Sequence, residues 1–223
     1  QTFLLELTSK NGALKKYQSG DLLVVRPEED NDDRYYSMTV RPDKRTALIS
    51  VRKHEYGIVS NYLARTEIQD RLTVSFQHNH SFHFPENAHQ VIMICNGTGI
   101  APFIGMIEAN RFKVPITLFW GGRNEDSRKL YQSIIDPLKS KGYIKQIRKA
   151  YSQNMDKKYV QDVLTEDQLF ISMSLAGQGH VLICGSLIMQ KGVEKVLDEI
   201  TQKNLKQPRS DFQELGLIKS DCY

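Results

Sequence analysis

The pattern of hydrophobic and polar residues divides the chain into two parts. In the first part, turn residues such as Asn11-Gly12 separate short segments that alternate between apolar and polar positions or are briefly apolar. Five of these segments fit the period of a β-strand: residues 2–7, 22–25, 35–40, 47–53 and 71–76. An acidic loop, residues 28–33, follows the second of them. Several short strands at this spacing predict a small antiparallel β-barrel.

After residue 86 the pattern changes to apolar runs that alternate with helical segments. Runs of the kind found in buried parallel strands occupy residues 91–95, 116–120, 143–150 and 181–184. Helical patterns occupy residues 127–139, 159–174 and 187–202. This alternation predicts a doubly wound α/β fold with a parallel sheet. We therefore expect two domains, residues 1–86 and residues 87–223.

The composition narrows the class of protein without indicating a reaction. The 223 residues are 40% hydrophobic and 25% charged, as in ordinary globular proteins. No run approaches the roughly 20 apolar residues of a membrane-spanning helix. The net charge of +4, from 30 basic and 26 acidic residues, is not typical of a nucleic-acid-binding protein.

The cysteines and histidines predict neither a disulfide framework nor a metal site. Three cysteines are too few and too scattered for either: Cys95, Cys184 and Cys222. Free thiols fit a reducing compartment, so we expect a cytoplasmic location or the cytoplasmic face of a membrane protein. Four histidines between residues 78 and 89 lack matching carboxylate or thiol ligands.

A glycine-containing turn lies between the first apolar strand of the second part and the helix that follows it. Gly97, Thr98 and Gly99 occupy this turn, and Pro102 suits the first turn of a helix. Glycines there allow backbone N–H groups to approach an anion, and the helix N-terminus adds a positive dipole end. A purely structural turn is the alternative, but the position after the first strand of an α/β domain favours nucleotide binding.

Two motifs together give the chain a specific resemblance. The residues 97–103, Gly-Thr-Gly-Ile-Ala-Pro-Phe, and Arg34-Tyr35-Tyr36-Ser37 upstream resemble the ferredoxin–NADP⁺ reductase family. The similarity is to the reductase halves of diflavin enzymes, such as cytochrome P450 reductase and the sulfite reductase flavoprotein. In that family an FAD-binding barrel precedes an NADP-binding domain, which is the order predicted for this chain.

The resemblance implies an FAD site in the first domain. Arg34 would hold the pyrophosphate, Tyr36 beside Tyr35 would lie against one flavin face, and Ser37 would form a hydrogen bond near the flavin N5. A second motif would hold the FAD diphosphate at the start of a short helix: Gly57, Ile58, Val59 and Ser60. Ser60 is also a plausible helix cap, a role compatible with phosphate binding.

The resemblance also implies an NADPH site in the second domain. Arg123 would reach a phosphate, and the adenosine 2′-phosphate end would contact a set of residues further along: Ser152, Gln153, Lys157, Tyr159 and Gln161. Gln153 stands where the family has an arginine, and the loss of that charge-assisted bond would weaken the preference for NADPH by about 1.5–3 kcal/mol. Lys149 and Lys158 are candidates to compensate. NADPH remains favoured over NADH.

A last set of residues is implied to surround the reacting atoms. Cys184 would lie next to the nicotinamide C4, while Asp221 and Ser37 would position charge and hydrogen-bond donors. Tyr223 would stack on the flavin face and swing away so that hydride can pass from NADPH to FAD. Two acidic positions of the family appear here as Ser186 and Gly192. Proximity and orientation would supply most of the rate.

We therefore expect an FAD-dependent NADPH reductase module that passes electrons to a flavodoxin-like, haem or iron–sulfur protein or domain. An NADH-dependent reductase of the cytochrome b5 or oxygenase type is one alternative, and a flavin-less binding domain on the same scaffold is another. The family barrel normally has a strand before residues 2–7, so we expect a barrel without its first strand. An upstream electron-transfer domain or membrane tether would then precede this chain.

Overall fold

A computed structural model describes residues 1–27 and 32–223, and the chain divides into two compact units. Unit 1 comprises Gln1–His83 and Ala101–Ala109, and unit 2 comprises Phe84–Ile100 and Asn110–Tyr223. Most of the predicted acidic loop, residues 28–31, lies outside the described residues. The assignment of FAD to residues 1–86 and of NADP to residues 87–223 stays a prediction.

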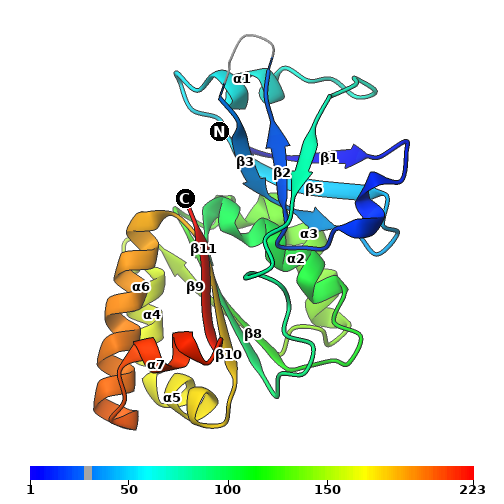
Figure 1. Ribbon diagram of the computed structural model, residues 1–223. Helices are drawn as coiled ribbons and strands as arrows, with labels where there is room; N and C mark the ends of the chain where they lie inside the picture. Colours follow the sequence, from blue (N-terminus) through cyan, green and yellow to red (C-terminus); the bar gives the residue numbers. More distant parts are fainter. Residues whose placement is uncertain (28–31) are drawn as a thin grey trace. The chain divides into compact units, whose positions relative to one another are not determined.

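Unit 1 contains two three-stranded antiparallel sheets (Figure 1). The first sheet has the order β1-β5-β4, and its strands are β1 (Thr2–Thr8), β5 (Thr46–Arg52) and β4 (Thr39–Val40). The second has the order β3-β2-β6, and its strands are β3 (Arg34–Ser37), β2 (Leu22–Val25) and β6 (Ser75–Gln77). The antiparallel class predicted from the sequence is therefore confirmed, while closure into one barrel stays a prediction.

The apolar residues of these strands meet in one core. It contains Leu23 and Val25 of β2, Ile49 and Val51 of β5, and Leu63 of α1 (Ile58–Ala64), all nearly fully buried. The short 3₁₀-helix η1 (Ala13–Lys16) contributes to the same core. Every second residue of β2 and β5 belongs to this core, and because burial of apolar surface stabilises by about 25 cal/mol per Å², this period of two fixes which face of each strand points toward it.

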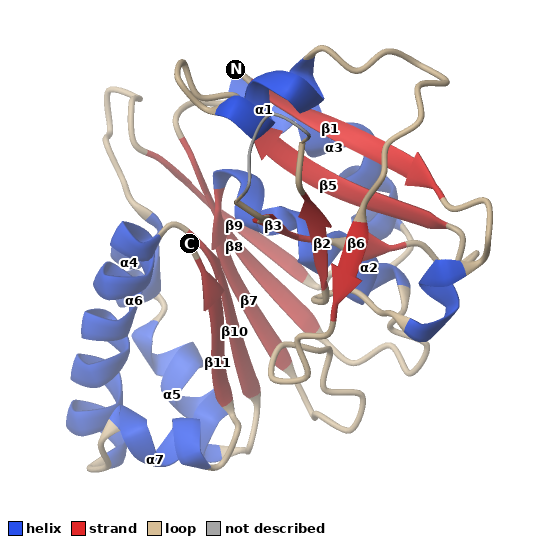
Figure 2. Ribbon diagram, turned by 45° about the horizontal axis from the view of Figure 1, so that its top comes forward, coloured by secondary structure: helices blue, strands red, loops and turns tan. Residues whose placement is uncertain are grey.

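Unit 2 is built on a five-stranded parallel sheet with the order β11-β10-β7-β8-β9 (Figure 2). Its strands are β7 (Val91–Asn96), β8 (Ile116–Gly122), β9 (Gln146–Tyr151), β10 (His180–Gly185) and β11 (Ile218–Cys222). Strand β7 lies between β8, the next strand along the chain, and β10, which follows much later in the chain. The strand order thus reverses at β7, which makes the crevice between β7 and β10 a topological switch point.

Helices cover both faces of this sheet. A single core joins Ile92, Ile94 and Ile183 to four helices: α4 (Val160–Glu166), α5 (Gln168–Ala176), α6 (Leu187–Ile200) and α7 (Arg209–Glu214). Trp120 points to the opposite face and contacts Tyr131 of α3 (Asp126–Ser140). The doubly wound α/β class predicted from the sequence is therefore confirmed.

Three predicted elements differ from the observed ones. The predicted strand at residues 71–76 is wrong except at its end, because Leu72 and Val74 pack against the core without a strand partner. The predicted helix at residues 159–174 is two helices that meet at Asp167, which both Nε and Nη2 of Arg148 contact at 2.6 and 2.8 Å. The predicted strand at residues 35–40 breaks at Met38 into β3 and β4.

The other boundaries shift by a few residues, and some of the observed elements were not predicted. The last long helix ends at Ile200 and passes into a π-helical turn, η3 (Thr201–Leu205), while β9 begins at Gln146 rather than at residue 143. Helix α7 and strand β11 have no counterpart among the predicted elements. Within the described residues, no helix combines the length and apolar character that crossing a membrane requires.

Candidate functional site

The glycine turn lies at the switch point of unit 2. It forms a 3₁₀-helix, η2 (Gly97–Ile100), which leads directly into α2 (Ala101–Glu108). A Cβ atom on Gly99 would lie 2.2 Å from the carbonyl oxygen of Cys184 and 2.7 Å from the Cα of Gly185. Only glycine permits this approach of η2 to the end of β10. The turn therefore carries the backbone amides and glycines that a nucleotide pyrophosphate requires.

Asn96 joins the ends of β7 and β10, and the sequence did not single it out. Its Oδ1 accepts a hydrogen bond from the backbone N–H of Ser186 at 2.9 Å, and its Nδ2 donates to Ser186 Oγ at 3.0 Å. Ser186 is the N-cap of α6 and accepts from the backbone N–H of Met189. Asn96, which directly precedes the glycine turn, thus fixes the end of β7 to the start of α6.

We expect Asn96→Ala to destabilise unit 2 by about 1–3 kcal/mol, because it leaves the two Ser186 groups without their partner. For a chain of this size that corresponds to a fall in Tm of about 2–12 °C. Asn96→Asp keeps the acceptor and should recover most of the loss, since the Ser186 hydroxyl can donate to it. Thermal melting followed by circular dichroism compares the two variants, and equal Tm values for Asn96→Ala and the unchanged chain would contradict this role.

Tyr223 lies over the same turn. Its backbone N–H donates to Gly185 O at 2.9 Å, and its carbonyl oxygen accepts from the N–H of Leu187 at 3.2 Å, so β10 and α6 hold its main chain. Its hydroxyl forms a 2.9 Å hydrogen bond with Thr98 Oγ1. The residue remains 56% exposed, yet burial of the hydroxyl end, followed by the nearby Cys184 thiol, raises the pKa of Tyr223. The phenol therefore stays neutral at physiological pH.

A row of registered residues crosses the sheet beside this ring. Cys95 of β7 pairs with Cys184 of β10, which pairs with Asp221 of β11. Registered residues of parallel strands share one face, so Cys184 and Asp221 are neighbours there, while their common role at a site stays a prediction. Cys95 and Cys184 are fully buried. The thiol of Cys184 therefore has no exposed surface.

Two thiols of this sheet, those of Cys95 and Cys222, are poor nucleophiles. Burial raises the pKa of Cys95 well above its ordinary value, and burial raises the pKa of Cys222 to about 11. Because the thiolate is the reactive species, neither residue is suited to covalent catalysis at neutral pH. The arrangement fits a site that positions a ligand rather than one that forms a covalent intermediate.

The loop after β9 gathers the residues predicted to bind the 2′-phosphate end. The backbone N–H groups of Ser152 and Gln153 donate to Gly122 O and Arg123 O at 3.0 and 2.8 Å, so this loop continues the β8–β9 pairing. Lys157 Nζ lies 5.1 Å from the centre of the Tyr159 ring. Tyr159 is the N-cap of α4, and its N–H donates to Asp162 Oδ2 at 2.7 Å. These residues are largely exposed and close to one another.

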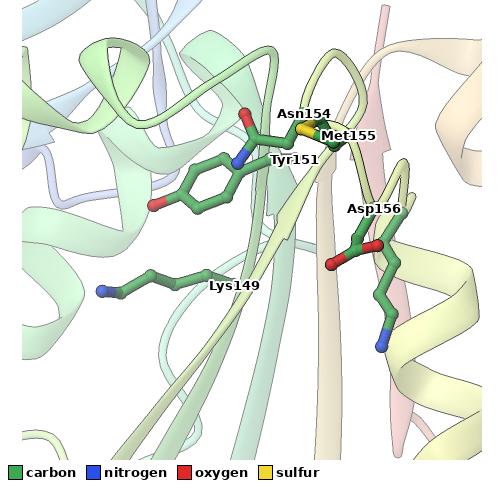
Figure 3. A pocket seen from close by; sticks show the side chains of 6 residues that line it. Lys149, Tyr151, Asn154, Met155 and Asp156 are labelled. Carbon is green, nitrogen blue, oxygen red and sulfur yellow. The ribbon is translucent and has the colours of Figure 1, made fainter.

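A depression of about 590 Å³ opens beside this loop (Figure 3). It is lined by Lys149, Tyr151, Asn154, Met155, Asp156 and Lys158. Lys149, Tyr151 and Asn154 lie on one side of it, with Asp156 on the other (Figure 3). Lys158 Nζ forms a 2.6 Å ion pair with Glu166, whereas in the described part of the chain Lys149 has no ion-pair partner. Of the two candidate lysines, Lys149 is therefore the better placed to meet an anion.

Gln161 occupies a position that explains one departure from the family pattern. A Cβ atom on Gly192 would lie 3.1 Å from Gln161 Nε2, so the Gln161 amide packs against the backbone of α6. An acidic side chain at residue 192 would displace that amide. The glycine thus allows α4 and α6 to approach each other at this point.

The first set of predicted flavin residues lies in unit 1 on β3. Arg34 and Tyr35 are exposed, Tyr36 is partly buried against the core of the unit, and Ser37 is buried. Burial raises the pKa of Tyr36, and the nearby Arg34 opposes this shift. Arg34 Nη1 lies 3.8 Å from Asp32 Oδ2. A guanidinium and two tyrosine rings therefore stand on one short strand with surface available to a ligand.

The second set of predicted flavin residues, Gly57 to Ser60, lies at the start of α1. Gly57 is the N-cap of this helix, and a Cβ atom there would lie 2.5 Å from Ser60 Oγ. The Ser60 hydroxyl donates to Gly57 O at 3.2 Å and accepts from the N–H of His54 at 3.1 Å. The predicted N-cap role of Ser60 is therefore wrong, because Gly57 caps the helix and Ser60 lies within its first turn. The first amides of an α-helix have no intrahelical acceptor, so those of Ile58 and Val59 are suited to a phosphate.

Comparison with known proteins agrees with this architecture. A family model for the oxidoreductase NAD-binding domain matches residues 93–195. The bifunctional cytochrome P450/NADPH–P450 reductase of Fusarium oxysporum is 31% identical over 180 residues, which cover 74% of this chain and 17% of that protein. The sulfite reductase [NADPH] flavoprotein alpha-component of Baumannia cicadellinicola subsp. Homalodisca coagulata is 36% identical over 148 residues, 63% of this chain and 25% of that protein.

A nitric oxide synthase of Bombyx mori is 29% identical over 185 residues, 75% of this chain and 15% of that protein. The chain thus spans between 15% and 25% of the length of these three relatives. Its fold and glycine turn define an NAD-binding oxidoreductase domain. The chain belongs to the ferredoxin–NADP⁺ reductase superfamily, as the sequence motifs predicted.

Proposed function

We propose that this chain is an FAD-dependent NADPH reductase module that passes electrons to a protein acceptor. The observation that carries the proposal is the arrangement at the switch point of unit 2. There the Gly97–Gly99 turn, the buried Cys184 and the Tyr223 ring meet at the carboxyl ends of β7 and β10. In open α/β sheets this crevice is where nucleotides bind.

The residues of unit 2 would bind and orient NADPH. The amides of the Gly97–Gly99 turn and the start of α2 would hold the pyrophosphate, and the exposed Arg123 would neutralise part of its charge. Tyr223 would leave its place beside Cys184 before a nicotinamide ring could contact that thiol. Asp221, on the same face as Cys184, would position charge next to the reacting carbon. Such orientation supplies most of the rate in hydride transfer.

The residues of unit 1 would hold FAD. Arg34 offers a fork of donors for the pyrophosphate, the Tyr35 and Tyr36 rings offer flat surfaces, and the first amides of α1 offer an anion site. Ser37 would orient the ring system near its reacting nitrogen. FAD, when bound, supplies the acceptor of the hydride and the carrier of single electrons.

The acceptor is proposed to be a haem, iron–sulfur or flavodoxin-like protein or domain. One relative is named a bifunctional cytochrome P450/NADPH–P450 reductase, and another is named a self-sufficient cytochrome P450 monooxygenase. This chain matches 17% and 15% of their respective lengths. In those proteins the electron acceptor is therefore part of the same polypeptide. A tether to a membrane upstream of this chain stays a further proposal.

Steady-state assays with an artificial dye acceptor test this function. We expect the purified chain, supplied with FAD, to oxidise NADPH with a kcat/KM above that for NADH. An NADH-dependent reductase is the less favoured alternative, because three relatives have NADPH in their names. Equal values, or a preference for NADH, would contradict the NADPH assignment. A chain that binds no FAD and oxidises neither nucleotide would support a flavin-less binding domain.

Lys149 provides a sharper test of cofactor choice. We expect Lys149→Ala to raise the KM for NADPH at least about tenfold, because a charge-assisted hydrogen bond to a phosphate contributes about 1.5–3 kcal/mol. The KM for NADH should stay unchanged, since NADH has no 2′-phosphate. Lys158→Ala is the matched control and should change either KM less than twofold, because Glu166 already pairs with that ammonium. A larger effect at Lys158 than at Lys149 would reverse the assignment.

A further inference from the structure

Thr39 is fully buried at the start of β4, and its hydroxyl forms hydrogen bonds with backbone groups of helix α2. Thr39 Oγ1 accepts a hydrogen bond from the backbone N–H of Gly105 at 2.9 Å and donates to the carbonyl oxygen of Ala101. These two backbone groups are four residues apart and close one turn of an α-helix. A single hydroxyl therefore fastens the first turn of α2 to β4.

The surrounding contacts leave α2 little freedom to shift along β4. A Cβ atom on Gly105 would lie 2.1 Å from Ser19 Oγ and 2.8 Å from Thr39 Cγ2. Ser19 Oγ is itself held, because it accepts from the N–H of Val40 at 2.9 Å and donates to Val40 O at 3.3 Å. Glycine at residue 105 lets the helix backbone reach the Thr39 hydroxyl.

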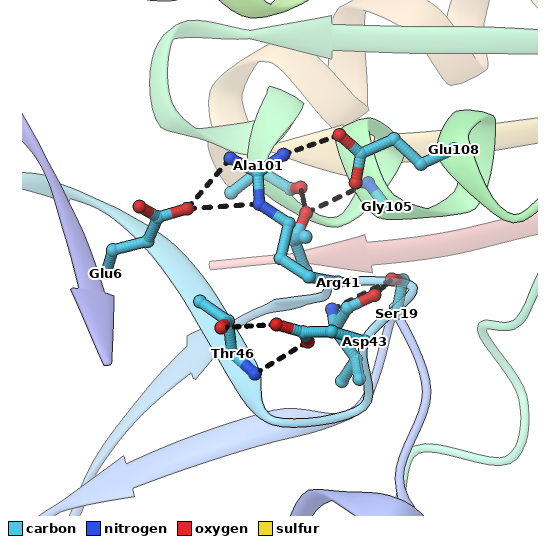
Figure 4. A network of polar contacts seen from close by, with 10 residues as sticks. Glu6, Ser19, Arg41, Asp43, Thr46, Ala101, Gly105 and Glu108 are labelled. Carbon is cyan, nitrogen blue, oxygen red and sulfur yellow. Dashed lines mark hydrogen bonds and ion pairs between the residues drawn. The ribbon is translucent and has the colours of Figure 1, made fainter. Parts of the chain in front are cut away.

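A second contact holds the other end of the helix. Arg41, two residues after Thr39, forms ion pairs with Glu108 at 2.5 Å and with Glu6 at 2.9 Å (Figure 4). Burial raises the pKa of Glu108, and the Arg41 charge opposes that shift. Both ends of α2 are thus tied to residues 39–41 of unit 1.

The position of α2 in the chain gives this attachment a consequence for function. Ala101 follows directly after η2, so the residue that Thr39 holds is two positions from Gly99. Thr39 is also two positions after Ser37, the last residue of β3. One hydroxyl therefore connects the strand of the proposed flavin residues to the helix that continues the proposed pyrophosphate turn.

We propose that Thr39 is a positioning residue for NADPH, whose hydroxyl fixes the start of α2 and thereby the Gly97–Gly99 turn that holds the pyrophosphate. This inference rests on the proposed function. It means that pyrophosphate binding depends on Thr39, a residue that lies outside the Gly97–Gly99 turn. Thr39→Val has nearly the same shape and leaves the Ala101 and Gly105 groups to satisfy each other within the helix, so the variant is expected to fold.

The test compares two ligands in the full chain supplied with FAD. NADP⁺ carries the pyrophosphate, whereas adenosine 2′-monophosphate carries only the 2′-phosphate end. We expect Thr39→Val to raise the Kd for NADP⁺ about tenfold, roughly the effect of one lost hydrogen bond, and to leave the Kd for adenosine 2′-monophosphate unchanged. Thr39→Ser restores the hydroxyl and should bind NADP⁺ within about twofold of the original chain.

Two controls separate this role from a loss of folding. Thr46→Val removes another threonine hydroxyl of unit 1, one that donates to Asp43 Oδ2 at 2.9 Å, and should leave both Kd values unchanged. Hydrogen exchange of residues 97–105 should speed up in Thr39→Val while that of β1 and β5 stays the same. If Thr39→Val does not fold, Thr39→Cys takes its place, with an intermediate effect expected from the weak thiol donor.

The outcomes distinguish this inference from the proposed function. Unchanged NADP⁺ binding in Thr39→Val, or an equal loss of both ligands, overturns the positioning role and leaves the proposed function standing. Failure of Thr39→Ser to restore binding overturns it as well. If the original chain binds neither ligand, the proposed function itself fails. A selective loss of NADP⁺ binding that serine restores supports the inference.

Discussion

Replacing Tyr223 by serine is expected to raise kcat/KM for NADH at least tenfold relative to kcat/KM for NADPH. The Tyr223 ring lies beside the buried Cys184 and is held by its hydrogen bond to Thr98 Oγ1. In the proposed mechanism a nicotinamide ring takes the place of this ring beside Cys184, and moving the ring breaks that bond at a cost of about 0.5–1.5 kcal/mol. Because the 2′-phosphate contact slows its dissociation, NADPH stays bound long enough for the ring to move, so removal of the ring raises kcat/KM less for NADPH than for NADH.

Steady-state kinetics of both nucleotides with a dye acceptor measure this effect. Thr98→Val is the control, because it removes the hydrogen bond and keeps the tyrosine ring. In this variant the ratio of kcat/KM for NADH to kcat/KM for NADPH should rise about two- to fivefold. If Tyr223→Ser leaves the ratio of the two kcat/KM values unchanged, Tyr223 does not occupy the position of the nicotinamide. The role proposed for it would then be wrong.

Gly99→Ala is expected to lower turnover of NADPH at least a hundredfold. Its methyl group would lie 2.2 Å from the carbonyl oxygen of Cys184, and neither backbone can move away without disturbing β10 or the start of α2. A displacement of about 1 Å in a positioning element costs on the order of a hundredfold in rate. Overpacking of this kind should also destabilise unit 2 by about 1–3 kcal/mol, or roughly 2–12 °C in Tm.

Gly97→Asn is the control for this substitution. Gly97 has a φ of +51°, but a Cβ atom there meets nothing within 4 Å. Asparagine tolerates that left-handed conformation better than other residues, so its Tm should fall less than that of Gly99→Ala. Thermal melting and NADPH turnover are measured on both variants. A larger loss of stability at Gly97 would show that backbone conformation, rather than close approach, governs the turn.

Sequence patterns predicted the elements whose residues carry a strong local signal. The apolar run at residues 91–95 and the glycines that follow it predicted both β7 and the turn at the switch point. Strand β11 (Ile218–Cys222) was not predicted, because its residues, Ile-Lys-Ser-Asp-Cys, include only one β-branched residue. It forms because β10 offers a free edge to pair with, in register from Val181↔Ile218 onward.

In the candidate site, likewise, the sequence predicted residues that belong to local motifs but missed contacts between residues far apart in the chain. Cys184 and Asp221 were predicted to act together, and their strand register makes them neighbours. Asn96 was not predicted, because its partner Ser186 is 90 residues away in the chain. The ion pair of Lys158 with Glu166 likewise depends on how the loop after β9 folds against α4. The meeting of Ser37 with Cys184, Asp221 and Tyr223 stays a prediction.

The central claim is that this chain binds FAD and delivers a hydride to it from NADPH. An anaerobic titration of the FAD-loaded chain with NADPH, followed by flavin absorbance near 450 nm, tests it most directly. We expect a yellow protein whose absorbance falls in proportion to added NADPH and is fully lost at one equivalent per FAD. A chain that retains FAD but keeps its absorbance in excess NADPH, or that binds no FAD, would contradict the claim.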